Sequence, residues 1–315
     1  MPSAAEPLHL LIPDARPPLP PGTSAPPLPA LAQLDTALRQ LAPQGLITAD
    51  EQVPATAFEL ALAQAQGLPG EPGRIPWAAF EQHVHGTPCA WLRPCHWQLG
   101  MDSVTLVDPA ALALTEAESR ALLAALQPLL TEDGVALDYV RPDAWLARGT
   151  LFRGLRTWSM ARAVQHPLTR EVLADAPSPA QSALLRRLQS EWQMLLYTHP
   201  VNEAREAARQ WPVNAVWIDG AGEWAQPVAP TGEIVVDYRL AECPPGDTAA
   251  RAAAWRALDA ERFAALAQAL RAGRDARLTL AGPSHALTLA PARGWRTRIS
   301  NVFSPLSARK LPDML

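Results

Sequence analysis

Several polar side chains that could hold a small anion are concentrated in one segment of the sequence. They are His199, Asn202, Arg205 and Asn214, and an apolar stretch that ends in Gly-Ala-Gly follows them. A guanidinium binds a phosphate or carboxylate through two parallel hydrogen bonds, and amide and imidazole groups can complete such a pocket. A structural alternative remains open, because a His-Pro pair can cap a helix and asparagine side chains often bond loop backbone. The four residues, together with His96, are candidate ligand-binding residues.

The glycines of Gly220-Ala221-Gly222 offer a second way to hold a phosphate, through backbone N–H groups. Their spacing matches neither a Walker loop nor a dinucleotide-binding fingerprint. Glycine is also the residue that a tight turn requires, since it adopts positive φ angles at little steric cost. The sequence therefore favours a tight turn after an apolar strand over a phosphate cradle.

Histidines and cysteines gather in a third place. They are His83, His85, Cys89, Cys95 and His96. Imidazole and thiolate are the usual ligands of zinc, but these pairs lack the spacing of zinc fingers and prolines interrupt them. Buried thiols and partly exposed histidines are the preferred interpretation. A catalytic pair of Cys95 and His96 is disfavoured too, because neighbouring side chains in a strand point to opposite faces. We therefore predict no metal site here.

The composition limits the kinds of partner. The chain has 315 residues, of which 48% are hydrophobic and 18% charged, with 27 basic and 31 acidic side chains. This length and apolar content suffice for a large folded core. The lack of a basic cluster argues against nucleic acid as a partner. No apolar run reaches the ~20 residues that span a bilayer, so no membrane partner is expected. Three cysteines without Cys-x-x-Cys spacing favour the cytoplasm.

Hydrophobic periodicity predicts strands that alternate with helices. Strands are predicted at 8–12, 104–107, 135–140, 215–218, 233–238, 277–280 and 286–289. Helices are predicted at 31–41, 55–66, 115–126, 178–199 and 249–272. The clearest helix starts are Thr115, where Glu118 completes a capping box, and Ser178, where a proline follows the N-cap. Asp259 and Arg262 fall on the apolar face of the last helix, either as a charge pair at a contact or with their charges at its edge.

The order of the elements predicts the fold class and the domains. Strands alternating with helices are typical of an α/β fold with a largely parallel sheet and flanking helices. Tryptophan, histidine and cysteine become frequent after residue 75, which indicates an inserted α+β subdomain. We expect a discontinuous α/β core at 7–75 and 168–300, an inserted subdomain at 76–167 and a C-terminal tail at 301–315.

The residues from 199 to 222 resemble a signature of the archaeal-type cofactor-independent phosphoglycerate mutases, members of the alkaline phosphatase superfamily. That family has a similar His-Pro-x-Asn-x-x-Arg run, then Pro-x-Asn and a strand ending in Gly-x-Gly. The stretches 29–35, 102–126 and 134–145 agree with it in order and spacing. The chain also resembles proteobacterial RpfE-type regulatory proteins, on the runs Pro94-Cys95-His96-Trp97-Gln98 and Glu191-Trp192-Gln193-Met194. The resemblance implies an alkaline-phosphatase-like core.

The resemblance also implies a chemistry, in which two divalent cations are held by Asp and His and a Ser or Thr nucleophile carries a phosphoryl group. Asp14 follows the first predicted strand, as the family's first Asp does, but no glycine accompanies it. Thr23 and Ser24 are the hydroxyls nearest the nucleophile position, and His285 matches an Asp-His element whose Asp is missing. These four are the catalytic candidates. The sequence after Gly222 is shorter than the region of the family's later metal ligands, so we expect most ligands to be missing.

Three hypotheses about function follow from this mixture of retained and missing residues. The favoured one is a cytoplasmic, catalytically degenerate relative of phosphoglycerate mutase that needs no cofactor. It binds a phosphorylated or carboxylate small molecule or a protein partner, with a role in regulation. The second is an active mutase or metal-dependent phosphatase with a rearranged site, which requires a divalent metal such as Mn²⁺. The third is a structural interaction protein.

Overall fold

The chain folds into two compact units. A computed structural model describes residues 7–17, 26–100, 103–165, 176–225, 232–292 and 306–315. One unit, called the N/C unit here, joins Met1–Gln52, Thr56–Gly67 and Val228–Leu315. The other, called the middle unit, consists of Val53–Ala55 and Leu68–Pro227. Within the described residues, every helix falls short of the length or the apolarity that a bilayer span requires.

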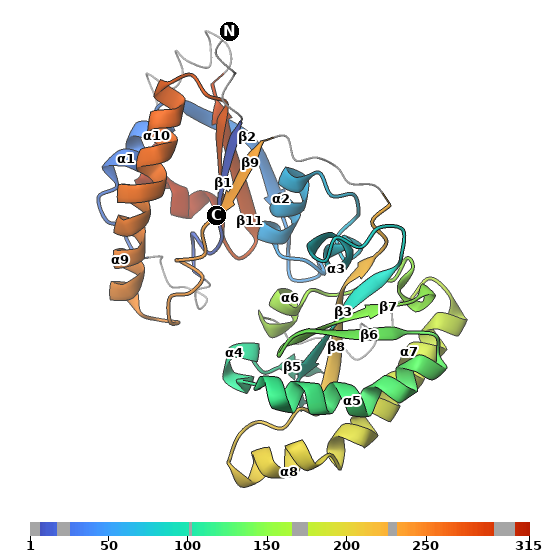
Figure 1. The fold of residues 1–315 in the computed structure, drawn as a ribbon. Helices are drawn as coiled ribbons and strands as arrows, with labels where there is room; N and C mark the ends of the chain where they lie inside the picture. The colour runs from blue at the N-terminus through green and yellow to red at the C-terminus, as the bar shows by residue number, and fades with distance from the viewer. Residues whose placement is uncertain (1–6, 18–25, 101–102, 166–175, 226–231, 293–305) are drawn as a thin grey trace. The chain divides into compact units, whose positions relative to one another are not determined.

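The N/C unit is built on a five-stranded sheet of mixed direction (Figure 1). In spatial order its strands are β2 (Leu41–Thr48), β11 (His285–Pro291), β10 (Ala276–Ala281), β1 (Leu8–Ile12) and β9 (Glu233–Val236). β1 pairs in parallel with β9 and β10, whereas β10–β11 and β11–β2 are antiparallel. The α/β class is confirmed. The expectation of a largely parallel sheet is wrong, because a short turn at 282–284 reverses the chain between β10 and β11.

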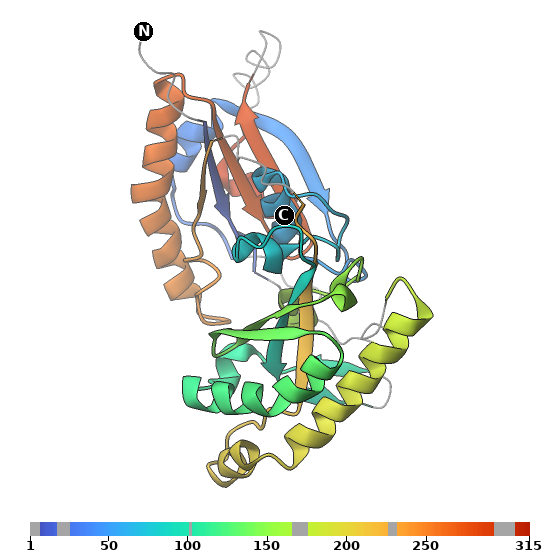
Figure 2. The ribbon, with the colours of Figure 1, turned by 45° about the vertical axis from the view of Figure 1, so that its right-hand side comes forward.

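Helices cover both faces of this sheet (Figure 1, Figure 2). One face carries α1 (Ala32–Leu38), α9 (Thr248–Leu258) and α10 (Ala264–Arg271), and the other carries α2 (Ala57–Gln66). Strand side chains alternate between the faces, so Leu10, Ile12 and Leu278 enter the apolar cluster under α1, α9 and α10. This cluster is the core of the unit.

The helix predicted at 249–272 is interrupted by a π-helical segment, Asp259–Phe263. Asp259 accepts hydrogen bonds at 3.3 and 2.8 Å from two backbone N–H groups at the start of α1, so it caps that helix from another element. Arg262 donates from Nε to Asp237 at 2.8 Å. Each of the two charges is thus bound to a different element, and of the two alternatives the charge pair between them does not form.

Polar side chains lie on the α2 face of the sheet, where aliphatic residues are usual. His9 Nε2 lies 2.8 Å from Thr279 Oγ1, which in turn lies 2.8 Å from Thr288 Oγ1. Thr279 is fully buried. Burial, and to a lesser extent the charge of Arg277, lower the pKa of His9 from 6.5 to about 4. The imidazole is therefore neutral near pH 7.

We expect the His9 imidazole to make the stability depend on pH. The unfolded chain takes up a proton at His9 near pH 6.5 and the folded chain only near pH 4. The contribution is therefore complete above pH 6.5 and is lost as the pH falls towards 4, by at most about 3 kcal/mol. Urea unfolding of wild type and His9→Gln on both sides of this range measures it. An equal loss in the two proteins would contradict the expectation.

The middle unit contains a four-stranded antiparallel sheet and a separate two-stranded ladder. The sheet consists, in spatial order, of β6 (Ala136–Arg141), β7 (Ala144–Arg148), β3 (Cys89–Cys95) and β8 (Ala215–Gly222). The ladder pairs β4 (Trp97–Leu99) with β5 (Val104–Leu106). The helices are α3 (Trp77–Glu81), α4 (Pro109–Leu112), α5 (Glu116–Glu132), α6 (Met160–Gln165), α7 (Pro179–Tyr197) and α8 (Pro200–Ala207).

Two of the predicted helix starts are confirmed in this unit. Thr115 and Glu118 form the complete capping box of α5, and Ser178 accepts a hydrogen bond from the Gln181 N–H at the start of α7. The apolar side of α7 packs with α5 and the sheet in one cluster. For that reason the stretch from 176 to 225 belongs to the middle unit, whereas the sequence pattern placed 168–300 in the α/β core.

Gly220-Ala221-Gly222 lies within β8 and not in the tight turn that the sequence favoured. The register of β8 against β3 shifts here, which marks a bulge. Gly220 has a φ of 60°, and a Cβ at this position would lie 3.0 Å from the Cβ of Trp77. The glycine therefore lets α3 pack directly on the bulged strand.

Gly220→Ala should be destabilising for two reasons, the positive φ and the contact with Trp77. We expect a loss of about 2–4 kcal/mol in the free energy of unfolding. Gly134→Ala is the matched control, because Gly134 has a φ of 72° but open space around the added Cβ. The control should lose only about 1 kcal/mol. Urea unfolding of both variants provides the comparison, and similar losses would show that α3 does not pack as described.

Candidate functional site

The loop between α8 and β8, residues 208–214, is held by two buried side chains of α8. Asn202 accepts a hydrogen bond from the N–H of Val213 and donates one to the Val213 carbonyl, both at 2.7 Å. The same amide group donates to a carbonyl at the end of α7, also at 2.7 Å. Arg205 Nε donates to the Trp211 carbonyl at 2.8 Å. The two side chains thus fix the path of the chain into β8.

The other nitrogens of Arg205 connect α8 to elements that precede it in the sequence. Nη1 donates to the Glu118 carboxylate at 2.9 Å, and Nη2 donates to the Leu112 carbonyl. Burial acts to raise the pKa of Glu118, but hydrogen bonds from Thr115 and Arg205 outweigh it and hold that pKa below its usual value. One carboxylate therefore caps α5 and binds α8.

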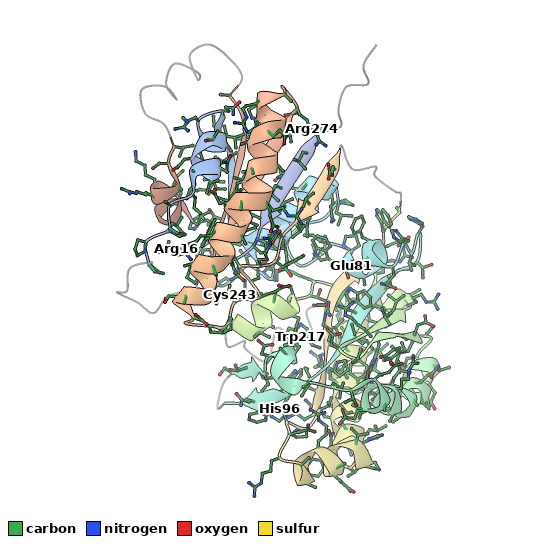
Figure 3. The ribbon with its side chains drawn as sticks, turned by 60° about the vertical axis from the view of Figure 1, so that its left-hand side comes forward. Arg16, Glu81, His96, Trp217, Cys243 and Arg274 are labelled. Atoms are coloured by element: carbon green, nitrogen blue, oxygen red, sulfur yellow. The ribbon has the colours of Figure 1, made fainter. Side chains whose placement is uncertain are left out.

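Of the three further candidates, one contacts this loop, one belongs to it and one caps the start of α8. His96 Nδ1 lies 2.8 Å from the Pro212 carbonyl, and His96 is labelled in Figure 3. Asn214 accepts from the N–H of Trp97 at 2.7 Å and donates to the Trp97 carbonyl at 3.0 Å. His199 is the N-cap of α8, where its Nδ1 accepts a backbone N–H at 3.2 Å. All of these bonds go to the main chain.

Four of the ligand-binding candidates therefore hold this loop and the fifth, His199, caps the start of α8; we call the five residues the α8 clamp. Its members are His96, His199, Asn202, Arg205 and Asn214. Their hydrogen bonds satisfy loop and helix-end backbone, together with Glu118. A ligand at the clamp would have to replace some of these bonds, and the ligand-binding role of the five residues stays a prediction.

Asn202→Ala tests how strongly the loop depends on the clamp. The substitution leaves two buried carbonyls and one buried N–H without their amide partner, so we expect a loss of about 3 kcal/mol in the free energy of unfolding. Gln127→Ala removes an exposed amide from α5 and should change the stability by less than about 0.5 kcal/mol. Urea unfolding measures both. A loss as small as the control's would mean that the loop is held in another way.

The catalytic candidates that the structure describes lie at one edge of the N/C-unit sheet. Asp14 follows the carboxyl end of β1 with a φ of 51°, and His285 begins β11, next to the end of β10. Burial raises the pKa of Asp14, and the nearby charge of Arg251 opposes that shift. Thr23 and Ser24 lie outside the described residues. Open α/β sheets usually carry their sites at this edge.

Asp237, at the carboxyl end of β9, is a charged residue that the sequence patterns do not single out. Its carboxylate accepts hydrogen bonds from Arg239 at 2.9 and 3.0 Å and from Arg262 at 2.8 Å. Burial acts to raise the pKa of Asp237, but the bonds from Arg239 and Arg262 hold it below its usual range. The Asp-x-Arg spacing in the sequence indicates the pairing with Arg239. The pairing with Arg262 cannot be read from the sequence, because Arg262 comes from the π-helical segment.

These residues do not fit the two-metal site that the family resemblance implies. Asp237 is bound by two guanidinium groups, and Asp14 lies beside a third. In the parts of the chain that the structure describes, no three His, Cys, Asp or Glu side chains gather closely enough to hold a metal ion. Metal-dependent phosphoryl transfer requires such sets of ligands.

Two of the three cysteines show the properties of structural thiols. Cys89 and Cys95 are buried in β3, and burial raises the pKa of Cys89 to about 11 and that of Cys95 further still. A thiol that keeps its proton is a poor nucleophile and a poor metal ligand. All three cysteines are free.

The middle unit also contains a buried ion pair that the sequence patterns do not predict. Arg93 Nε lies 2.9 and 3.0 Å from the two carboxylate oxygens of Asp219, and the Met160 N–H donates to the same carboxylate at 3.0 Å. The guanidinium of Arg93 also lies over the ring of Trp91. Arg93 and Asp219 are 126 residues apart in the sequence, so only the pairing of β3 with β8 reveals them.

No protein-family model matches the chain. No curated protein matches it either. Among solved structures, it is similar to a cofactor-independent phosphoglycerate mutase from Thermoplasma acidophilum, with 13% identity and a TM-score of 0.38 over 98% of each chain. It is also similar to the PH0037 protein from Pyrococcus horikoshii, with 11% identity and a TM-score of 0.46 over 94% of this chain and 92% of that one. Both are distant likenesses.

Proposed function

We propose that the chain is a catalytically degenerate relative of phosphoglycerate mutase that acts by binding. Its ligand is a small phosphorylated or carboxylate molecule, or a protein partner, and its role is regulatory. The observation that carries the proposal is the pairing of Asp237 with Arg239 and Arg262 at the carboxyl edge of the sheet. The sequence resemblance of 199–222 to the mutases supports the ancestry, and the resemblance to RpfE-type proteins supports the regulatory role.

A metal ion at the carboxyl end of β9 would have to displace existing charge pairs. A divalent cation at Asp237 would join two guanidinium groups already within hydrogen-bond distance of the carboxylate. Like charges so close together repel, and removing the arginines from Asp237 would leave cations without their partner. Asp14 is a weak alternative ligand, because burial favours its protonated form. Guanidinium groups thus already pair with the carboxylate at the carboxyl end of β9.

The remaining features agree with a binding protein. The α8 clamp accounts for the mutase-like 199–222 segment through its hydrogen bonds to backbone, with no need for catalysis. An alkaline-phosphatase-like origin of the N/C unit is consistent with the parallel strands β9, β1 and β10. A cytoplasmic location is in keeping with three free thiols.

Metal analysis combined with a turnover assay on the full chain tests the proposal. After equilibration with Mn²⁺ and removal of unbound metal, we expect far less than one Mn²⁺ per chain. In the presence of Mn²⁺ we expect no interconversion of 3- and 2-phosphoglycerate and no hydrolysis of p-nitrophenyl phosphate. Stoichiometric Mn²⁺ together with phosphoryl transfer would overturn the proposal and favour the rearranged-site enzyme.

Two variants guard this assay against contaminating enzymes. Asp14→Asn and His285→Gln alter the catalytic candidates at the sheet edge. Turnover that belongs to the chain must fall in at least one of them, whereas turnover from a contaminant stays the same in both. Only turnover that responds to these variants counts against the proposal.

A further inference from the structure

A cavity of about 320 Å³ lies within the N/C unit, between the sheet and α2. Its polar side chains are His9, Gln44, Gln64, Glu233, Arg277 and Thr288. It is bordered by the first residues of β1, β9 and β10, so it lies at the opposite end of the parallel strands from Asp14 and Asp237. Its volume is at the lower end of the range of small-molecule sites.

The floor of the cavity is polar because of a hydrogen-bonded row of side chains across the sheet. His9, Thr279 and Thr288 come from three adjacent strands and are linked by two contacts of 2.8 Å. The contact with Thr279 engages Nε2 of His9, which leaves Nδ1 outside this row. An imidazole and a hydroxyl in a cavity wall can each donate or accept a hydrogen bond, as recognition of hydroxyl groups requires.

The charges around the cavity favour an anion. Arg277 lines it with a side chain that is 40% exposed, and its contact with Asp275 is 3.7 Å, longer than a hydrogen bond. The acidic Glu233 is bound by Arg274 at 2.9 Å (Arg274 is labelled in Figure 3). His9 is neutral near pH 7. The guanidinium of Arg277 is thus available to a carboxylate or phosphoryl group.

We propose that this cavity binds a small hydroxylated anion, whose carboxylate or phosphoryl group pairs with Arg277 and whose hydroxyl groups contact His9 and Thr288. The inference rests on the proposed binding function and names its site and ligand class. Carboxylate and phosphoryl groups share the chemistry that a guanidinium recognises, so the test includes a probe of each kind.

Calorimetric titration of the full chain with D-glycerate and with glycerol 3-phosphate tests the proposal. Glycerol is the uncharged analogue of both. We expect at least one of the two anions to bind about tenfold or more tightly than glycerol, as pairing with a guanidinium predicts. Arg277→Gln should weaken that binding about tenfold. Arg271→Gln, at the exposed end of α10, is the matched control and should bind as wild type does.

A second variant and a local signal keep the result independent of stability. Thr288→Val preserves the shape of the side chain, and it should reduce the preference for D-glycerate over propionate. A bound anion offsets the charge of Arg277, so the NMR titration of His9 should move to higher pH when ligand is present. Besides Arg277, the charged side chain that lines the cavity is Glu233. A signal at His9 locates the ligand directly.

Three outcomes would overturn the inference. They are unchanged affinity in both Arg277→Gln and Thr288→Val, equal binding of glycerol and the anions, and no binding of any probe to wild type. If Arg277→Gln does not fold, the affinities of Thr288→Val and the NMR titration of His9 decide whether the cavity binds the ligand. The proposed function is tested separately, by the measurements of bound Mn²⁺ and of phosphoryl transfer. A negative result for this cavity therefore does not overturn the proposed function, and a negative result for the proposed function does not overturn the cavity.

Discussion

Backbone groups that enter the core of the middle unit must find hydrogen-bond partners, and the chain just before β8 meets this requirement with side chains. Val213 is fully buried, and its N–H and carbonyl are both bound by Asn202. Without such a partner each buried group would cost about 1–3 kcal/mol. β8 pairs with β3 and packs against α3 and α7, so its position depends on the loop that leads into it. Arg205 extends the same support to α5 through Glu118.

This constraint explains why the most informative segment of the sequence is also the hardest to interpret. A histidine, an amide and an arginine at this spacing can bind an anion or can bind backbone, and the residue types are the same in both cases. Only the distances distinguish them, and here Asn202 and Arg205 lie within 2.9 Å of protein partners. The charge pairs could not be predicted from the sequence for a related reason. Arg93–Asp219 and Arg262–Asp237 join elements that only the fold brings together.

Some elements of the fold are determined by residues close in sequence, and others by residues that are distant in sequence. The starts of α5 and α7 can be predicted because a cap depends on neighbours in sequence. β2 cannot, since Pro43 and Gly45 look like a helix end, yet an edge strand tolerates both. The π-helical segment carries Asp259, whose partners at the start of α1 are distant in sequence. The unit to which α7 belongs is not a local property either, because an apolar helix face does not reveal which sheet it covers.

The two ends of the parallel strands in the N/C unit are chemically opposite, and that contrast bears on function. At the carboxyl end, Asp237 and its arginines satisfy one another, and a ligand there would have to break charge-assisted bonds. At the amino end, Arg277 lies 3.7 Å from Asp275, its one ion pair among the described residues, and borders a cavity with hydroxyl and imidazole groups. Binding is favoured where a charge gains a partner and not where it must exchange one. The charge of Arg277 therefore makes the amino end of the parallel strands the more favourable place for an anion.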